Sequence, residues 1–343
     1  MKKLLVMSLG VCVLLSGCAA KVEQSEKKQY NATFLTLFDT VTTVVGRADS
    51  QEEFSEMAQQ VHDRLLYYHQ LFDIYNDYEG VNNIKTINDN AGIAPVVVDR
   101  AVIDMLNDCR LYYEKTGGRV NAAMGSVLAL WHDARSSGIN DPVHAALPEE
   151  DALAEAAQHT DIELLIIDEE ASTVYIADPD MRLDVGAIAK GWATQKAAEQ
   201  SPEGLLISVG GNVCATGPKT EAGDAWVIGV RDPEGEADDY VHTLFVKEGS
   251  VVTSGDYQRA YMVDGRMYHH IIDPDTLFPA EFWRSVTVVC ADSGAADALS
   301  TALFTLPLEE GQALLDQFGA QAMWVAADGS IYYSPGFEDM IRT

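Results

Sequence analysis

The chain has 343 residues, of which 47% are hydrophobic and 22% are charged, a composition typical of a globular protein with an apolar core and not of a disordered one. Its formal charge is −30, from 53 acidic and 23 basic residues, so the phosphate backbone of nucleic acid would be repelled and is excluded as a partner. A small anionic ligand remains compatible with this charge, provided that positive groups or a bridging metal neutralise it locally.

The N-terminus reads MKKLLVMSLGVCVLLSGCAA, with two lysines, an apolar run from Leu4 to Leu15 and then small residues. This order is typical of a secretory signal, and the apolar run is too short to span a bilayer. The segment LSGC resembles the bacterial lipobox, in which the cysteine, here Cys18, becomes the lipidated first residue. We expect a signal peptide at 1–17, a lipidated tether at 18–32 and one domain at 33–343, exported and lipid-anchored at the outer face of the cytoplasmic membrane. An ordinary signal peptide that happens to contain a cysteine is the alternative.

Three cysteines follow the lipid site, namely Cys109, Cys214 and Cys290. Their odd number and the lack of a C-x-x-C pair argue against a disulfide framework and against a zinc site. Cys109 and Cys290 lie in apolar surroundings, so we expect them to be buried small hydrophobic residues.

The first half of the chain is predicted to be mainly helical. A β-branched stretch at 34–46 predicts one strand, and Ser50 with Glu53 forms a capping box that begins a long helix. The stretch 81–92 reads as a loop. Asp99 is placed as the N-cap of the next helix, which Gly117 and Gly118 end, and Pro148 with three acids begins another.

The second half alternates more often between strand and helix. Strands are predicted at 163–168, 173–177, 204–212, 225–232, 241–249, 250–255 and 285–291, helices at 186–200, 294–306 and 308–318, and Asp-Gly hairpins at 264–265 and 328–329. Because no regular βαβ repeat is present, the predicted fold class is α+β, with mixed sheets and packed helices in one domain.

Two glycine-containing stretches could contact a phosphate. In LDVGAIAKG (183–191), Asp184 and a glycine lead into a helix that carries Lys190, and helix N-termini favour anions. In LISVGGN (206–212), two glycines after an apolar strand permit a close approach by a ligand or another backbone. Taken alone, each stretch is equally compatible with an ordinary turn.

Two further stretches offer a base and oxygen ligands. VTSGDY (252–257) ends a strand with hydroxyls, and HHIIDP follows it, with His269 and His270 expected to face opposite sides of a strand. One imidazole could therefore accept a proton in a site while the other is structural. Asp297 and Thr301 are four residues apart on a predicted apolar helix, and a buried carboxylate there needs a partner such as Mg²⁺ or a neighbouring turn.

In order and spacing, these four stretches resemble the ApbE family, the FAD:protein FMN transferases. The similarity covers nearly the whole mature chain, and VNAAMGSVLALWHDAR (120–135) resembles the family's flavin-pocket segment. The resemblance implies an α+β fold related to the T-fold. It also implies an enzyme that cleaves FAD at the pyrophosphate, transfers FMN to a threonine or serine hydroxyl of a partner protein and releases AMP.

The resemblance also assigns roles to residues. It implies that His270 is the base and that the metal ligands for Mg²⁺ are the carbonyl of Ala187 with Asp297 and Thr301. The residues that it places near FAD are Phe38, Tyr75, Ala123, Met124, Gly125, Asp184, Lys190, Thr253 and Ile271. The implied partners are FAD and an exported flavin-acceptor protein, a redox subunit at the membrane.

The chain departs from the family pattern at two positions. Leu277 replaces the glycine of the usual D-P-x-T-G-x-P, which leaves open a different loop shape after Asp273, and Ala187 stands where the first motif often has glycine. Metal binding through the carbonyl of Ala187 does not depend on that side chain. FAD hydrolysis to FMN and AMP, non-catalytic flavin storage and a generic solute-binding lipoprotein are the alternatives; the retained base disfavours storage, and the lack of two α/β lobes disfavours solute binding.

Overall fold

The structure is a computed structural model that describes residues 27–236 and 239–342. The predicted signal peptide at 1–17 and the lipidation site Cys18 lie outside these residues. Within the described ranges, no helix combines the length and the apolar character that crossing a membrane requires. Strand β1 begins at Lys28, so the last five residues of the range assigned to the tether belong to the fold.

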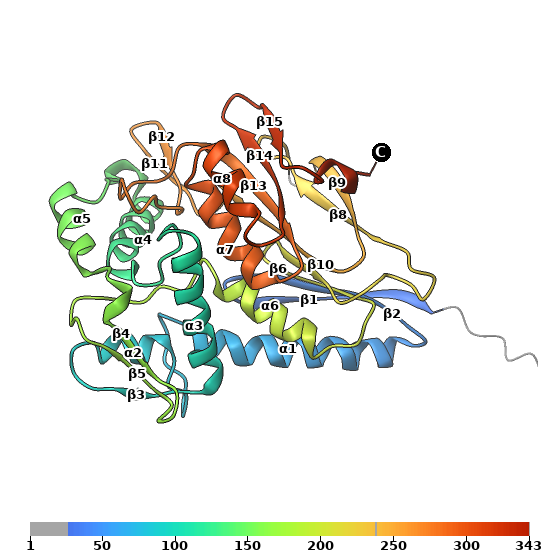
Figure 1. Cartoon of the computed structure of the whole chain (residues 1–343), viewed down its shortest axis with the longest axis horizontal. Helices are drawn as coiled ribbons and strands as arrows, with labels where there is room; N and C mark the ends of the chain where they lie inside the picture. Colours follow the sequence, from blue (N-terminus) through green and yellow to red (C-terminus); the bar gives the residue numbers. More distant parts are fainter. Residues whose placement is uncertain (1–26, 237–238, 343) are drawn as a thin grey trace, which may run out of the picture.

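Helices dominate the first half of the chain, and the second half contains a long run of consecutive strands (Figure 1). The strands are β1 (Lys28–Leu37), β2 (Thr40–Ala48), β3 (Val96–Val97), β4 (Leu165–Asp168), β5 (Thr173–Ile176), β6 (Leu205–Val209), β7 (Asn212–Ala215), β8 (Trp226–Arg231), β9 (Tyr240–Val246), β10 (Gly249–Gly255), β11 (Tyr261–Val263), β12 (Arg266–Tyr268), β13 (Trp283–Cys290), β14 (Gln321–Ala326) and β15 (Ile331–Tyr333).

The helices vary in length from single 3-10 turns to the long α1. The helices are α1 (Gln51–Phe72), α2 (Ile84–Asp89), α3 (Arg100–Lys115), α4 (Gly125–Asn140), α5 (Glu150–Ala156), α6 (Ala189–Glu199), α7 (Ser293–Phe304) and α8 (Leu308–Leu315), with 3-10 turns η1 (Pro142–His144), η2 (Ala157–His159), η3 (Ile162–Leu164) and η4 (Glu338–Met340). This mixture confirms the predicted α+β class.

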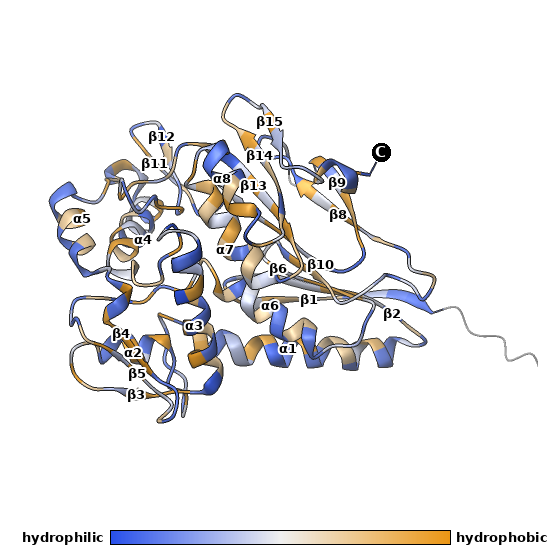
Figure 2. Cartoon of the chain, in the orientation of Figure 1, coloured by the Kyte–Doolittle hydropathy of each residue, from blue (hydrophilic) through white to orange (hydrophobic). Residues whose placement is uncertain are grey.

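An eight-stranded antiparallel sheet in the order β1-β2-β6-β7-β10-β13-β14-β15 organises the fold. Successive residues of its strands face opposite sides. Val252 and Val288 belong to the large core shared with the helices, whereas their neighbours Val251 and Val289 belong to a second core under β8 and β9. The sheet is therefore covered on both faces, and apolar residues recur along its central strands (Figure 2).

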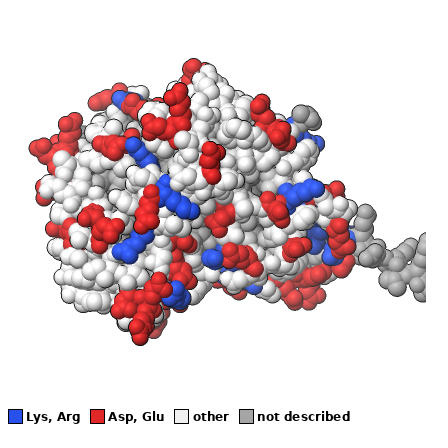
Figure 3. Space-filling view, viewed as in Figure 1, with Lys and Arg blue, Asp and Glu red and all other residues white. Residues whose placement is uncertain are grey.

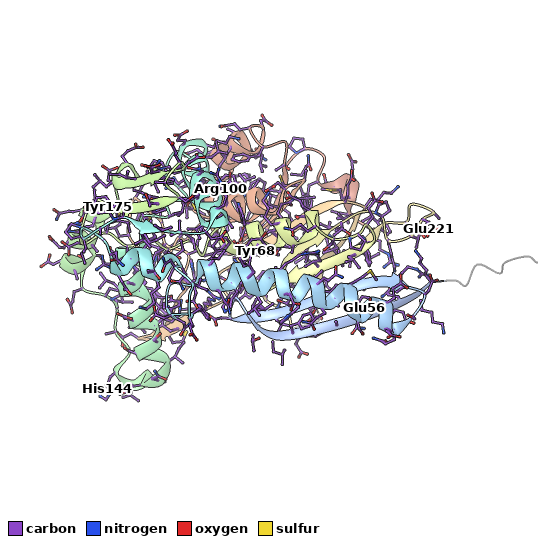
Figure 4. The ribbon with its side chains drawn as sticks, turned by 90° about the horizontal axis from the view of Figure 1, so that it is seen from below. Glu56, Tyr68, Arg100, His144, Tyr175 and Glu221 are labelled. Carbon is purple, nitrogen blue, oxygen red and sulfur yellow. The ribbon has the colours of Figure 1, made fainter. Side chains whose placement is uncertain are left out.

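Helices α1, α6 and α7 pack over the first face. In Figure 4, which looks at the molecule from below, α1 lies across the view and carries the exposed Glu56 and the buried Tyr68. The rings of Tyr68 and Phe72 meet the Trp192 indole of α6 edge-on, each at a centroid distance of 5.4 Å. These contacts are favourable aromatic pairs, and they fix α6 against α1.

Most predicted elements are confirmed, and four predictions need correction. The stretch 34–46 is two strands that turn at Phe38 and Asp39, both at positive φ. The predicted loop at 81–92 contains α2, which Asn83 and Thr86 cap reciprocally. No helix was predicted at 125–140, where α4 lies, and β12 ends at Tyr268, before the two histidines. The capped starts at Ser50 and Asp99, both Asp-Gly hairpins and the buried cysteines agree with the sequence.

Helices α6 and α7 approach each other closely at Gly191. A Cβ atom at this position would lie 2.2 Å from the Ser293 carbonyl oxygen and 2.5 Å from the Cβ of Asp297. The Gly191 N–H donates to the Asp297 Oδ2 at 2.8 Å across the same contact. Glycine is therefore required here to bring the backbone of α6 within hydrogen-bonding distance of the carboxylate.

We predict that Gly191→Ala lowers the free energy of unfolding by about 2 kcal/mol, because the added methyl group forces the two helices apart and outweighs the better helix propensity of alanine. Gly294→Ala is the matched control, since its Cβ would be 3.2 Å from its nearest neighbour, the Asp292 Oδ1. Urea unfolding followed by circular dichroism measures both. Equal, small changes in the two variants would contradict the assigned role of Gly191.

Candidate active site

A cavity of about 370 Å³ lies where the ends of several elements meet, within the size range of small-molecule sites. It is lined from the β1–β2 turn, α4, the segment before α6, the β6–β7 turn, the end of β10, the segment after β12 and α7. Ten residues that the sequence placed in the site line this one cavity, namely Tyr75, Met124, Asp184, Ala187, Lys190, Thr253, His270, Ile271, Asp297 and Thr301.

Three other predicted residues do not line the cavity. Phe38 lies beside lining residues Asp39 and Thr40, but its ring packs edge-on against His69. Ala123 is fully buried in the core. Gly125 is buried at the start of α4, where a Cβ would be 2.5 Å from the Arg182 carbonyl oxygen. The last two therefore support the neighbouring Met124 and do not form the cavity wall.

The Asp297 carboxylate is 3% exposed and joins α7 to the start of α6. Its bond from the Gly191 N–H has a consequence for the first turn of α6. In a regular turn, that N–H would donate to the Ala187 carbonyl four residues earlier, as the Trp192 N–H does to the Ile188 carbonyl at 2.9 Å. Since Asp297 takes the donor, the Ala187 carbonyl lacks this helical partner, and Ala187 lines the cavity.

Lys190 is the present counter-ion of Asp297. Its Nζ is 3.3 Å from both carboxylate oxygens and 3.3 Å from the Gly186 carbonyl oxygen. Thr301 follows Asp297 by one turn and lines the cavity, and no described residue hydrogen-bonds its hydroxyl, whereas the Ser300 hydroxyl donates to the Asp297 carbonyl at 2.9 Å. Asp297, Thr301 and Ala187 thus line one cavity. Their carboxylate, hydroxyl and backbone carbonyl are oxygen ligands of the kind that a hard divalent cation prefers.

The two adjacent imidazoles have different hydrogen-bond partners. His269 is buried; its Nε2–H donates to the Ala280 carbonyl at 2.8 Å, and its Nδ1 accepts from the Ile271 N–H at 3.2 Å. His270 donates only from Nδ1, to the Gln258 carbonyl at 3.2 Å. Because a carbonyl can only accept, the proton of neutral His270 is on Nδ1, and Nε2 keeps its lone pair available.

Burial lowers the pKa of His270 to about 3, and the neighbouring positive charges of Arg259, Arg135 and Lys190 act in the same direction. Burial also lowers the pKa of His269. Both rings are therefore neutral at physiological pH, as a proton acceptor must be before it acts.

The sequence did not indicate three arginines and one amide that line the cavity. Arg119 pairs with Asp273 at 3.1 Å and Asp275 at 2.6 Å, and Arg135 and Arg259 lie near His270. Asn212 is 2% exposed, and its Nδ2 has no partner among the described residues. Only Asn212 had a signal, because it ends the glycine motif; the arginines come together through the tertiary fold alone.

The loop after Asp273 accommodates Leu277 in a glycine-like conformation. Leu277 has φ 62, and its N–H donates to the Asp273 carbonyl at 2.8 Å while its own carbonyl accepts from the Trp131 indole at 2.8 Å. A leucine at positive φ costs about 1 kcal/mol, and these bonds offset the cost. Leu277 therefore occupies the position of the family's glycine at the cost of local backbone strain, without a change in the backbone conformation that glycine favours.

A family model for the ApbE family matches residues 36–324. The FAD:protein FMN transferase of Treponema pallidum is 37% identical over 279 residues, covering 76% of this chain and 75% of that protein, and one from Klebsiella pneumoniae is 34% identical over 257 residues, covering 72% and 77%. The crystal structure of the ApbE protein from Thermotoga maritima superposes with a TM-score of 0.80 at 29% identity, covering 92% of this chain and all of that one.

The fold and the cavity therefore define a protein of the flavin-transferase class. This chain belongs to the ApbE family. A flavin transferase from Vibrio cholerae, at 21% identity and a TM-score of 0.74, agrees with the same fold.

We predict that His269→Ala lowers the free energy of unfolding by about 3 kcal/mol, because it leaves two buried backbone groups without partners. His270→Ala is the matched control and should cost about 1 kcal/mol, since that ring makes one hydrogen bond and borders the cavity. Urea denaturation measures both. A larger loss of unfolding free energy in His270→Ala than in His269→Ala would show that His270, and not His269, is the structural imidazole.

Proposed function

We propose that this chain transfers FMN from FAD to a threonine or serine hydroxyl of an exported acceptor protein, using Mg²⁺ and releasing AMP. Its relatives among the FAD:protein FMN transferases support the reaction. The observation in the structure that carries the proposal is the convergence of the Asp297 carboxylate, the Thr301 hydroxyl and the freed Ala187 carbonyl on the cavity that His270 also lines.

The oxygen set fits the magnesium ion that the family implies. Asp297, Thr301 and the Ala187 carbonyl would hold it, with phosphate oxygens of the substrate completing the shell. Bound there, the ion supplies Lewis-acid polarisation of the P–O bond and charge stabilisation for the departing AMP. Lys190, which now balances Asp297, would be displaced toward the phosphates and would neutralise one of their charges.

The rest of the cavity would hold the dinucleotide. The N-terminal turn of α6 carries Lys190, which lines the cavity and would face an anion at the positive end of the helix. Tyr75 and Met124 offer ring and thioether surfaces for the flavin, and Thr253 and Ile271 also line the cavity. The side chain of Asp184 accepts from the Gly186 N–H at 2.8 Å, which holds the segment before α6 in place and leaves a carboxylate oxygen for the ligand.

The chemical step requires a base because a hydroxyl is a weak nucleophile at neutral pH. The acceptor oxygen forms a bond to the phosphorus of the FMN half, and the bond from that phosphorus to the bridging oxygen breaks. AMP leaves with the bridging oxygen and its electron pair, and the hydroxyl proton moves to the Nε2 of His270. The Gln258 carbonyl, which accepts from Nδ1, orients the ring and stabilises the imidazolium.

The acceptor is a protein exported with this chain, and we propose a redox subunit at the membrane. The N-terminal sequence supports this location, since a lipid on Cys18 would anchor the domain at the outer face of the cytoplasmic membrane.

The test combines two readouts. The purified protein is incubated with FAD, Mg²⁺ and a peptide that carries a threonine acceptor, and peptide flavin fluorescence and free AMP are measured together. Equal amounts of flavinylated peptide and AMP support transfer. AMP without labelled peptide supports hydrolysis, in which water replaces the hydroxyl, and tight FAD binding with neither product supports storage.

We predict that Asp297→Asn lowers the rate of AMP release at least about 100-fold, because an amide cannot neutralise the cation that the proposed site holds. Chelation by EDTA should abolish the wild-type rate and Mg²⁺ should restore it. Asp292→Asn, which changes the N-cap of the same helix outside the cavity, is the control and should remain within about twofold of wild type. Full activity in EDTA would refute the metal assignment.

We predict that His270→Ala lowers kcat for transfer by about 100-fold or more while the affinity for FAD changes by less than about threefold, since the ring acts on the acceptor proton. Single-turnover flavinylation and FAD fluorescence titration measure the two quantities. A parallel loss of FAD affinity would assign the ring to binding instead.

A further inference from the structure

Two arginines in the cavity lack an acidic partner. Arg135 lies on α4 and is half-buried, and Arg259 lies on the segment between β10 and β11 and is exposed at the cavity. Neither forms an ion pair with any carboxylate in the described ranges, whereas Arg119 in the same cavity has two. In a chain with 53 acids and 23 bases, unpaired cations in a cavity indicate a site for an anion.

Arg135 is held in place by a neutral group. Its guanidinium N–H donates to the Nδ1 of His132 at 2.9 Å, and the same Nδ1 is 3.2 Å from the Tyr75 hydroxyl. Because a guanidinium can only donate, Nδ1 of His132 carries no proton, and burial together with Arg135 lowers the pKa of His132. This contact orients Arg135 without neutralising its charge.

The backbone directs Arg259. It has φ 45, a left-handed conformation uncommon for arginine, and no described residue hydrogen-bonds its guanidinium. The preceding residue, Gln258, supplies the carbonyl that fixes His270. Strained residues of this kind gather at ligand sites, where the surrounding structure maintains them. The turn that orients the imidazole thus also carries a free cation beside it.

The two arginines repel one another, and burial followed by the charge of Arg259 lowers the pKa of Arg135. A negatively charged ligand would relieve this repulsion. The arginines also lie apart from the metal ligands along the chain, since Ala187, Asp297 and Thr301 come from the α6 and α7 regions. The positive charges of both arginines lower the pKa of His270.

We propose that Arg135 and Arg259 form a phosphate-binding subsite beside His270 that binds without a metal. Guanidinium groups match phosphate oxygens by paired N–H donors, and each such contact is stronger than one between neutral groups. The ligand is a phosphate monoester or diester of a nucleotide. Its assignment to the phosphate of FMN or to the AMP half of FAD rests on the proposed function, whereas the subsite itself does not.

Phosphate bound in the subsite would also make the neutral His270 a stronger base than it is in the empty cavity. A phosphate placed between the arginines and the ring would offset their positive charge and raise the affinity of Nε2 for a proton. The empty cavity would then hold a weak base, and substrate binding would complete the catalytic arrangement.

The test uses the full chain in EDTA and compares ligands that differ by one phosphate. Fluorescence titration gives the dissociation constants of riboflavin and FMN, AMP and adenosine are tested by competition with FMN, and ³¹P NMR follows the phosphate of FMN. The variants are Arg135→Gln, Arg259→Gln and the double substitution. Arg100→Gln is the matched control, because Arg100 begins α3 (Figure 4) and pairs with Asp104 and Glu169 at the surface.

We expect FMN to bind at least about tenfold more tightly than riboflavin in EDTA, each single substitution to remove most of that preference, and the control to keep it. The protein could instead bind AMP more tightly than adenosine, lose that difference in the same variants, and bind FMN and riboflavin equally. That result would support the subsite and assign it to the adenylate half of FAD. Equal affinities for riboflavin and FMN together with equal affinities for AMP and adenosine would overturn it, as would preferences unchanged in the double variant.

These measurements need no turnover. If transfer fails but the phosphate preference is found, the subsite stands and the proposed function falls. If transfer is found but the preference is absent, the subsite alone is wrong.

Discussion

The hydrogen bond from the Gly191 N–H to the Asp297 carboxylate is the constraint on which the site depends. It requires α6 and α7 to approach so closely that only glycine fits at the contact. It satisfies one oxygen of a buried carboxylate, which would otherwise be costly. It also removes the donor that would occupy the Ala187 carbonyl. One packing contact therefore creates both the charged ligand and the neutral oxygen ligand of the candidate metal site.

The same region explains how a strongly acidic chain can bind an anionic dinucleotide. The acidic side chains are spread over the surface, where water screens them (Figure 3). Lys190, Arg135 and Arg259 line a cavity of about 370 Å³ with low local screening. The net charge of the molecule is therefore a poor guide to the potential at the site, which depends on a few nearby cations.

Much of the fold could be predicted from the sequence because the signals were local. Ser50 and Asp99 are capping residues that predict the starts of α1 and α3, and the two Asp-Gly pairs predict the hairpins. Helix α2 was missed because its six residues offer only one helical repeat of apolar positions, Ile84 and Ile87. The break between β1 and β2 was missed because Phe38 and Asp39 turn at positive φ without a glycine.

The candidate site was predictable only in part for a related reason. Residues in ordered motifs, such as Asp297 and Lys190, could be assigned together because the resemblance supplied their neighbours. Arg135 ends the flavin-pocket segment without having been assigned a role, and Arg259 belongs to no such motif. Their meeting near His270 depends on how α4 packs against β11. Ala123 and Gly125 do not line the cavity, since a motif contains residues that shape the backbone as well as residues that face the ligand.

The three histidines of the site are neutral, and they differ in which ring nitrogen carries the proton because each has a different hydrogen-bond partner. His132 must accept at Nδ1, because Arg135 can only donate, while His270 must donate at Nδ1, because a carbonyl can only accept. His269 accepts at Nδ1 and donates at Nε2, so the two adjacent rings are opposite tautomers. Burial keeps all three uncharged. The free Nε2 of His270 thus follows from the hydrogen bond to the Gln258 carbonyl, and the sequence alone does not distinguish this ring from the adjacent His269.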